Sequence, residues 1–234
     1  MSSELSFSRI ILYKRIIMSN WLILIIVFEF TVFVLSAIFY RSLKANKLVS
    51  LPYFLFFILA GELLGFWIAK RYHSNTGYYN TFSTLQIGYY LLLIYHSICS
   101  AKAKKILAGC IIAFFVASII NYYFIKDNSN ELISYSFTIG CLFITLGSAY
   151  FFYELLLSTN IENYTTYPLF WIMLGLFVFY VCNIPYMSVY NYLSINYTRI
   201  FMAYFKIIEV LNYMMYSFFI IGIICSSRRK SHLH

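Results

Sequence analysis

Charged residues are scarce in this chain. Only 11% of its 234 residues are Asp, Glu, Lys or Arg, whereas 62% are hydrophobic and 22% are aromatic. A soluble domain carries about 25% charged residues. Because so few charges cannot cover a surface that faces water, the composition excludes a soluble globular protein. It predicts an integral membrane protein whose solvent is the bilayer.

Cysteine and histidine are also few and scattered. The five cysteines lie within or at the ends of apolar runs and form no CxxC pair, which argues against a disulfide framework or a zinc site. Of the four histidines only His96 falls in a predicted span. No phosphate loop, HExxH or nucleotide fingerprint is present. We therefore expect no metal and no cofactor, and the pattern identifies no catalytic residue.

The net charge of +9 does not indicate a nucleic-acid partner. The basic residues stand in small groups between apolar runs, for example Lys102, Lys104 and Lys105. Groups placed in this way are typical of loops that face anionic lipid headgroups. Membrane lipids are thus the expected partners, and nucleic acid is not.

Long hydrophobic runs are abundant instead. Seven of them have roughly the 20 residues that a helix needs to cross the hydrocarbon core. Since backbone groups in lipid must pair internally, each run is expected to be a helix. The predicted fold is all-α, a polytopic membrane protein formed by a seven-transmembrane helix bundle. The spans are predicted at residues 20–40, 51–71, 80–100, 105–125, 133–156, 168–190 and 201–225.

Short segments flank this transmembrane domain of residues 20–225. Residues 1–19 are a short N-terminal segment, either interfacial or upstream of the true start, because Met18 is an alternative start next to the first span. Residues 226–234 form a basic tail that contains Arg228, Arg229 and Lys230.

Basic residues also indicate the orientation of the bundle. With the C-terminus inside, nine Lys or Arg residues face inward and seven outward, and a start at Met18 leaves four outside. The positive-inside rule then favours an outer N-terminus and a cytoplasmic C-terminus. The richness in Ile, Phe, Tyr, Asn and Lys suggests an AT-rich bacterial genome. The predicted location is the bacterial inner membrane, as a multi-pass cell-membrane protein.

Several predicted spans carry polar residues at a similar depth. In LAGELLGFW, Glu62 stands between Gly61 and Gly65, a GxxxG pattern that lets another backbone approach closely. At 1.5 Å per residue, the polar groups of five spans lie roughly 9–14 Å from the face that holds the N-terminus. We interpret them as one candidate polar cavity in that half of the bundle. Its predicted members are Glu29, Glu62, Gln86, Asn183, Lys206, Glu209 and Asn212.

Buried carboxylates are costly in a membrane, at about 2.5–3.5 kcal/mol each on insertion scales. At least one of Glu29, Glu62 and Glu209 is therefore expected to be protonated near neutral pH, with Lys206 as a counter-charge to Glu209. Each polar residue taken alone could instead be hydrogen-bond glue between helices, contributing about 1 kcal/mol. For Glu62 and Glu209 the two interpretations stay open.

Three stretches carry a resemblance. FFILAGELLGFWIAK, YNTFSTLQIGYYLLLIY after a short Asn-rich loop, and YPLFWIMLGLFVFYVCNIPY resemble a family of small, uncharacterised, seven-span bacterial integral membrane proteins. Most of the chain from Asn20 to Cys225 fits that layout. The resemblance implies the span count and a start near Met18, and it implies no activity, cofactor or catalytic residue.

Three functions fit these features. The first is a binding or signalling component that holds a small molecule or lipid in the polar cavity, or that passes a signal to a protein partner at the inner face. The second is a lipid-modifying intramembrane enzyme in which buried glutamates supply acid–base chemistry. The third is a small-solute or proton-coupled transporter, which would need polar residues that continue toward the inner face.

Overall fold

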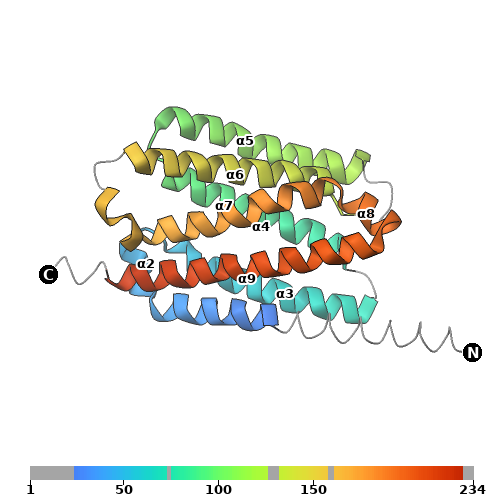
Figure 1. Ribbon diagram of the computed structural model, residues 1–234, viewed down its shortest axis with the longest axis horizontal. Coiled ribbons are helices and arrows are strands. Elements are labelled where there is room, and N and C mark those ends of the chain that lie inside the picture. The colour runs from blue at the N-terminus through green and yellow to red at the C-terminus, as the bar shows by residue number, and fades with distance from the viewer. Residues whose placement is uncertain (1–23, 73–74, 126–131, 158–160, 229–234) are drawn as a thin grey trace, which may run out of the picture.

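The computed structural model describes residues 24–72, 75–125, 132–157 and 161–228, which are almost entirely helical and contain no strand (Figure 1). The all-α prediction is thereby confirmed. The predicted N-terminal segment 1–19 and most of the tail 226–234 lie outside the described residues. The elements are a helix over Leu24–Ile38, α2 (Tyr40–Ala45), α3 (Ser50–Tyr72), α4 (Thr76–Ser97), α5 (Ala101–Ile120) with the π-helical turn η1 (Asn121–Ile125), α6 (Ser134–Leu157), the 3-10 turn η2 (Ile161–Thr166), α7 (Pro168–Ser188), α8 (Tyr190–Asn196) and α9 (Thr198–Arg228).

Five of the described helices are long and apolar enough to cross a membrane. They are α3, α5 with η1, α6, α7 and α9. The multi-pass membrane prediction is confirmed in this form. The Leu24–Ile38 helix is apolar but shorter within the described residues, and α4 falls below the hydropathy of the five. Tyrosines, Asn80 and Gln86 lower the hydropathy of α4, although its 22 residues give it sufficient length.

The long helices lie side by side in one bundle (Figure 1). α7 packs most extensively against α9 and α6, and α4 lies against α3, α5 and α6. The Leu24–Ile38 helix joins α9 and α3 through aromatic contacts, Phe28 with Tyr213 and Phe33 with Phe56. This helix and α9 both run from the right end of the bundle in Figure 1 to the left end, so the chain enters and leaves the described bundle at opposite ends.

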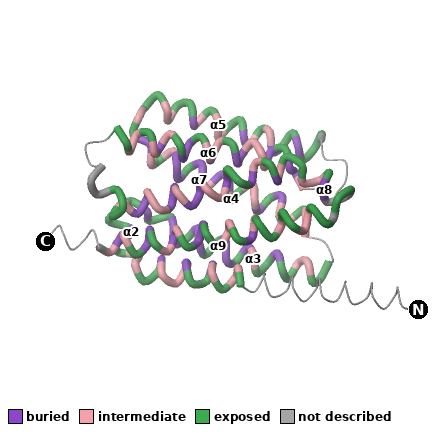
Figure 2. Tube along the Cα trace, viewed as in Figure 1, coloured by how far each residue is buried: buried purple, intermediate pink, exposed green. Residues whose placement is uncertain are grey.

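Burial follows the pattern of a bundle in lipid. Buried residues line the faces between helices, and exposed ones cover the outside (Figure 2). Many exposed residues are large and apolar, such as Ile106 on α5, which is 70% exposed. Apolar side chains on that scale are unfavourable in water and favourable against acyl chains. α5 is the least buried of the five membrane-crossing helices.

Two glycines lie at the contact between α7 and α9. A Cβ added at Gly222 of α9 would lie 2.8 Å from the Pro168 carbonyl oxygen of α7, and one added at Gly175 would lie 3.1 Å from the Met215 carbonyl oxygen. The backbones of α7 and α9 approach because neither position carries a side chain, which is how small residues act in membrane helices.

Polar side chains tie the helix ends together. The Glu154 carboxylate near the end of α6 accepts hydrogen bonds from the backbone N–H groups of Cys99 (2.7 Å) and Ser100 (2.8 Å), directly before α5. At the other end of the bundle, the Asn80 side chain accepts from Ile133 N (3.1 Å) and Asn191 donates to Leu132 O (3.1 Å). These bonds satisfy backbone groups that the helices themselves leave unpaired at their ends.

Candidate functional site

Glu29 is the most deeply buried of the predicted acidic residues. Its side chain is 3% exposed, and its Oε1 accepts a hydrogen bond of 2.8 Å from the hydroxyl of Tyr216 on α9, which is itself 1% exposed. Within the described part of the chain, the second oxygen, Oε2, has no hydrogen-bond partner. Buried polar atoms are nearly always paired, so an orphaned carboxyl oxygen marks a position that could take a further donor.

Glu62 on α3 is half-buried and paired with a different tyrosine. The Tyr79 hydroxyl of α4 donates to Glu62 Oε2 at 2.7 Å. The flanking glycines make this possible, because a Cβ at Gly65 would lie 2.8 Å from Tyr79 Oη and one at Gly61 would run into the Phe82 ring. The GxxxG pattern therefore serves the packing of α4 on α3 within one bundle.

The two carboxyl groups form one centre, which we call the carboxylate pair (Glu29 and Glu62). They interact electrostatically with each other, and Tyr79 and Tyr216 each interact electrostatically with both carboxyl groups. Four helices thus contribute to the pair: Leu24–Ile38, α3, α4 and α9. Two negative charges that interact in the interior of a membrane bundle repel each other, and a bound proton, cation or hydrogen-bond donor relieves that repulsion.

Gln86 lies on α4, one turn before the buried ring of Tyr90. It is half-buried and approaches the Tyr90 hydroxyl without meeting hydrogen-bond geometry. The Tyr90 ring is fully buried and packs edge-on against Tyr180 of α7 at 5.8 Å and Phe219 of α9 at 6.4 Å between ring centroids. These three rings join α4, α7 and α9 in the core.

Asn183 is buried in α7 but is satisfied by its own helix. Its side-chain amide donates to the Phe179 carbonyl oxygen at 2.9 Å. This bond is the local pattern that short polar side chains form in membrane helices. The structure therefore shows Asn183 as an internal hydrogen bond of α7, with the buried rings of Tyr180 and Tyr186 on the same face.

Glu209, Lys206 and Asn212 belong to a second polar group on α9. Glu209 is 7% exposed and interacts electrostatically with the exposed Lys206, one turn away, while Asn212 is half-buried on the following turn. Tyr186 of α7 lies against this group. Glu209 is seven residues, or roughly 10 Å, from Tyr216 along the helix. The predicted single level is thus divided into the carboxylate pair and the Glu209 group.

Tyr213 connects the two groups. It interacts electrostatically with Glu209, and its ring packs against Phe28, the neighbour of Glu29, at 5.2 Å.

Tyr79, the hydrogen-bond partner of Glu62, was not among the residues predicted from the sequence. Tyr79 lies four residues after Asn75, near the start of α4. Because α3 and α4 are consecutive and antiparallel, the start of α4 lies opposite the last third of α3, and this was the sequence feature that could have predicted the contact.

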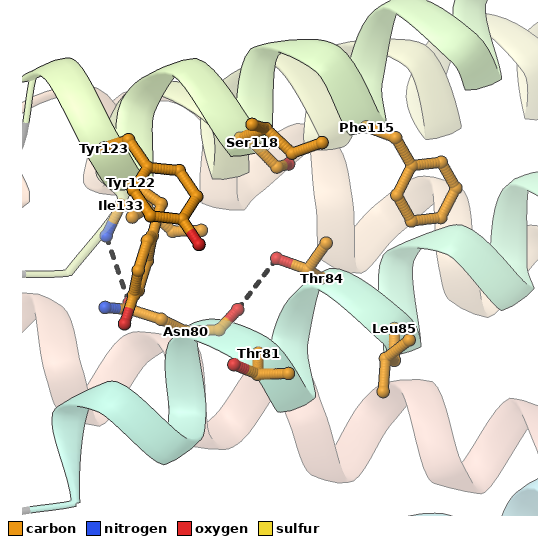
Figure 3. Close-up of a pocket in the computed structure, with 10 residues that line it drawn as sticks. Asn80, Thr81, Thr84, Leu85, Phe115, Ser118, Tyr122, Tyr123 and Ile133 are labelled. Carbon is orange, nitrogen blue, oxygen red and sulfur yellow. Dashed lines mark hydrogen bonds between the residues drawn. The ribbon is translucent and has the colours of Figure 1, made fainter.

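A separate groove lies between α4 and α5, with a volume of about 430 Å³ (Figure 3). Its walls include Asn80, Thr84, Phe115 and Ser118, and none of the predicted site residues lines it. Among the described residues, no group of three His, Cys, Asp or Glu side chains is placed to hold a metal ion. Comparison of the chain with protein-family models, curated proteins and solved structures finds no match.

Proposed function

We propose that the chain is a seven-span protein of the bacterial cell membrane, with its N-terminus outside and its C-terminus in the cytoplasm. The two helices beyond the five support this count. The 22 residues of α4 reach roughly 33 Å, enough for a hydrocarbon core of about 30 Å. The Leu24–Ile38 helix lies against α9 and α3. The opposite ends at which the described chain enters and leaves the bundle also favour an odd number of spans.

A topology experiment tests this arrangement. After His234, a fluorescent reporter that works only in the cytoplasm should be active, and a phosphatase that works only outside the cytoplasm should be inactive. Before Met18, the two reporters should give the opposite result. The same compartment for both fusion positions would exclude seven spans.

We infer that the protein is a membrane binding or signalling component whose ligand meets the carboxylate pair. The observation that carries this is the unpartnered Oε2 of buried Glu29 beside half-buried Glu62. A carboxyl oxygen without a donor is expensive to keep in the bundle. The chemistry fits an amphiphile with a cationic amine or several N–H or O–H donors, which enters past Glu62. The basic residues of the C-terminal sequence, Arg228, Arg229 and Lys230, suit a protein partner that receives the signal.

The binding test uses purified protein in a neutral detergent and a C14 series: tetradecylamine, tetradecanol and tetradecanoate. Because a ligand of the native state raises thermal stability by mass action, tetradecylamine should raise the Tm of the parent and tetradecanoate should not. Glu29→Gln and Glu62→Gln should abolish the shift. Glu209→Gln, the same chemical change in the other polar group, should retain it. An equal shift in all four proteins would refute a site at the carboxylate pair.

The stability of Glu62→Gln without ligand distinguishes a binding role of Glu62 from a structural hydrogen bond between helices. If Glu62 is kept for binding, removing its charge should leave Tm unchanged or raise it. A marked loss would identify Glu62 as a structural partner of Tyr79, and the binding proposal would then fail.

A second candidate is a lipid-modifying enzyme. Two interacting carboxyl groups, each hydrogen-bonded to a tyrosine hydroxyl at 2.7–2.8 Å, could act as general acid and base. Extracted membrane lipids incubated with the protein would show a new product that Glu62→Gln does not form. If the parent protein forms no product, the enzymatic function is refuted and the binding function is the one that stays.

A further inference from the structure

The groove between α4 and α5 opens sideways toward the lipid. Its rim includes Leu85, which is 50% exposed, and Ile119, which is 57% exposed, both on the outer surface of the bundle. Its floor includes the buried Asn80, Ser118 and Ile133. α5 is the least buried of the five helices that are long and apolar enough to cross a membrane, so this wall of the groove lies on the outside of the bundle. A molecule that enters the groove arrives from the bilayer.

The groove changes from polar to apolar along its length. Figure 3 shows Tyr122, Tyr123 and Asn80 at one end and Phe115 and Leu85 at the other. The polar end lies where α4 begins and α5 gives way to η1, near one end of the bundle. Leu85 lies five residues farther along α4 than Asn80, or roughly 7–8 Å deeper. This gradient matches an amphiphile with its polar end at the surface and its chain toward the bilayer centre.

The hydroxyl groups in the groove offer acceptors. Thr84 Oγ1 donates its hydrogen to the Asn80 carbonyl at 2.7 Å, and Ser118 Oγ donates to the Phe114 carbonyl at 2.9 Å. A hydroxyl has one donor and two lone pairs, so both oxygens keep acceptor capacity after these bonds form. They therefore match a ligand that brings O–H donors.

No charge is available in the groove. None of its ten lining residues is Asp, Glu, Lys, Arg or His. A phosphate, carboxylate or ammonium headgroup would find no counter-charge there and would lose hydration on entering. The volume of about 430 Å³ lies in the range of roughly 300–1,000 Å³ that small-molecule sites occupy.

We propose that this groove binds one uncharged lipid with a free hydroxyl, of the diacylglycerol class. The lipid hydroxyl donates to Thr84 or Ser118, and the start of one acyl chain lies on Leu85 and Phe115. The site is separate from the carboxylate pair, because Tyr79 and Phe82 turn toward α3, whereas Asn80 and Thr84 turn toward α5. The proposal thus stands independently of the function assigned to Glu29 and Glu62.

The test is photo-cross-linking of the full chain in phosphatidylcholine vesicles. The probes are a diacylglycerol and a phosphatidylcholine that carry the same diazirine acyl chain. Diacylglycerol should label peptides of α4 and α5 in preference to phosphatidylcholine, and unlabelled diacylglycerol should compete. Equal labelling by both probes would show an ordinary lipid-facing surface, and no labelling of α4 and α5 by either probe would show that lipid does not enter the groove. Either result overturns the proposal.

Matched variants locate the contact. Thr84→Val and Ser118→Ala remove the acceptor oxygens and should lower diacylglycerol labelling about three- to tenfold, as expected for the loss of one hydrogen bond. Thr145→Val is the control, because Thr145 on α6 makes the same kind of bond, to the Cys141 carbonyl at 2.8 Å. Leu85→Trp, at an exposed position, should block the apolar end without disturbing the core. Labelling that survives all three groove variants would refute the site.

Discussion

The hydrogen bond between Tyr216 and Glu29 provides the sharpest test of the candidate site. Tyr216→Phe removes the hydroxyl that donates to Glu29 Oε1, and Oε2 already lacks a partner in the described structure. Both oxygens of a carboxyl group that is 3% exposed would then be unsatisfied. A hydrogen bond between membrane helices contributes about 0.6–1.7 kcal/mol. A stranded buried polar group costs about 1–3 kcal/mol. We expect Tyr216→Phe to lower the free energy of unfolding by about 2 kcal/mol.

A double-mutant cycle with Glu29→Leu isolates this bond. In the Glu29→Leu background the Tyr216 hydroxyl is itself stranded, since the residue is 1% exposed. Tyr216→Phe should then be neutral or stabilise the protein by about 1 kcal/mol. The coupling energy would be about 2–3 kcal/mol, because the substitution destabilises the protein only when Glu29 is present.

The measurement is reversible unfolding in mixed micelles of dodecyl maltoside and SDS, followed by circular dichroism. Tyr186→Phe is the control, because Tyr186 is equally buried and its hydroxyl has no hydrogen-bond partner among the described residues. That change should leave stability the same or slightly higher. If Tyr216→Phe costs the same with Glu29 as with Leu at position 29, the bond contributes nothing and the carboxylate pair loses its anchor on α9.

Two further predictions concern helix packing. Glu154→Ala should lower the free energy of unfolding by about 1–3 kcal/mol, because it leaves the N–H groups of Cys99 and Ser100 without their acceptor, and Glu154→Gln should lower it less; equal stability of both variants and the parent in the same unfolding assay would contradict this. Gly61→Ala should destabilise the α3–α4 contact because its Cβ meets the Phe82 ring, whereas Gly109→Ala, with open space around it, should be neutral or stabilise α5 by up to about 1 kcal/mol. A similar Tm for the two alanine variants would show that α4 can shift away from α3.

Local sequence strongly specifies membrane helices. The all-α prediction was confirmed, and five of the described helices are long and apolar enough to cross a membrane. The predicted span at 133–156 corresponds to α6 at Ser134–Leu157, and the predicted span at 168–190 corresponds to α7 at Pro168–Ser188. Length and hydropathy decide these elements, since a backbone in lipid can only pair within itself. The hydropathy of α4 is lower, because Asn80, Gln86 and several tyrosines are polar side chains, some of which contact neighbouring helices.

The candidate site was less predictable than the helices. Sequence spacing placed Glu29, Glu62 and Glu209 at one depth, and depth is a property of each helix alone. Which side chains meet at that depth depends on how each helix is rotated and which helices are neighbours. Asn183 bonds within its own helix, and Glu209 interacts with Lys206 one turn away on α9, so both pairs are local. The contacts of Glu29 with Tyr216 and of Glu62 with Tyr79 join different helices, and spacing along one helix does not show them.

The sequence by itself determined that the chain is helical and apolar enough for a membrane, and it located the long helices to within a few residues, because composition and run length decide these features against the solvent. The short helices α2 and α8 were not predicted. Only the tertiary structure decided that Glu29 and Glu62 share one centre, that Tyr216 and Tyr79 hold them, and that the GxxxG of α3 receives α4. Those contacts join residues up to 187 positions apart. No local periodicity encodes such pairs, since they follow from the order and rotation of packed helices.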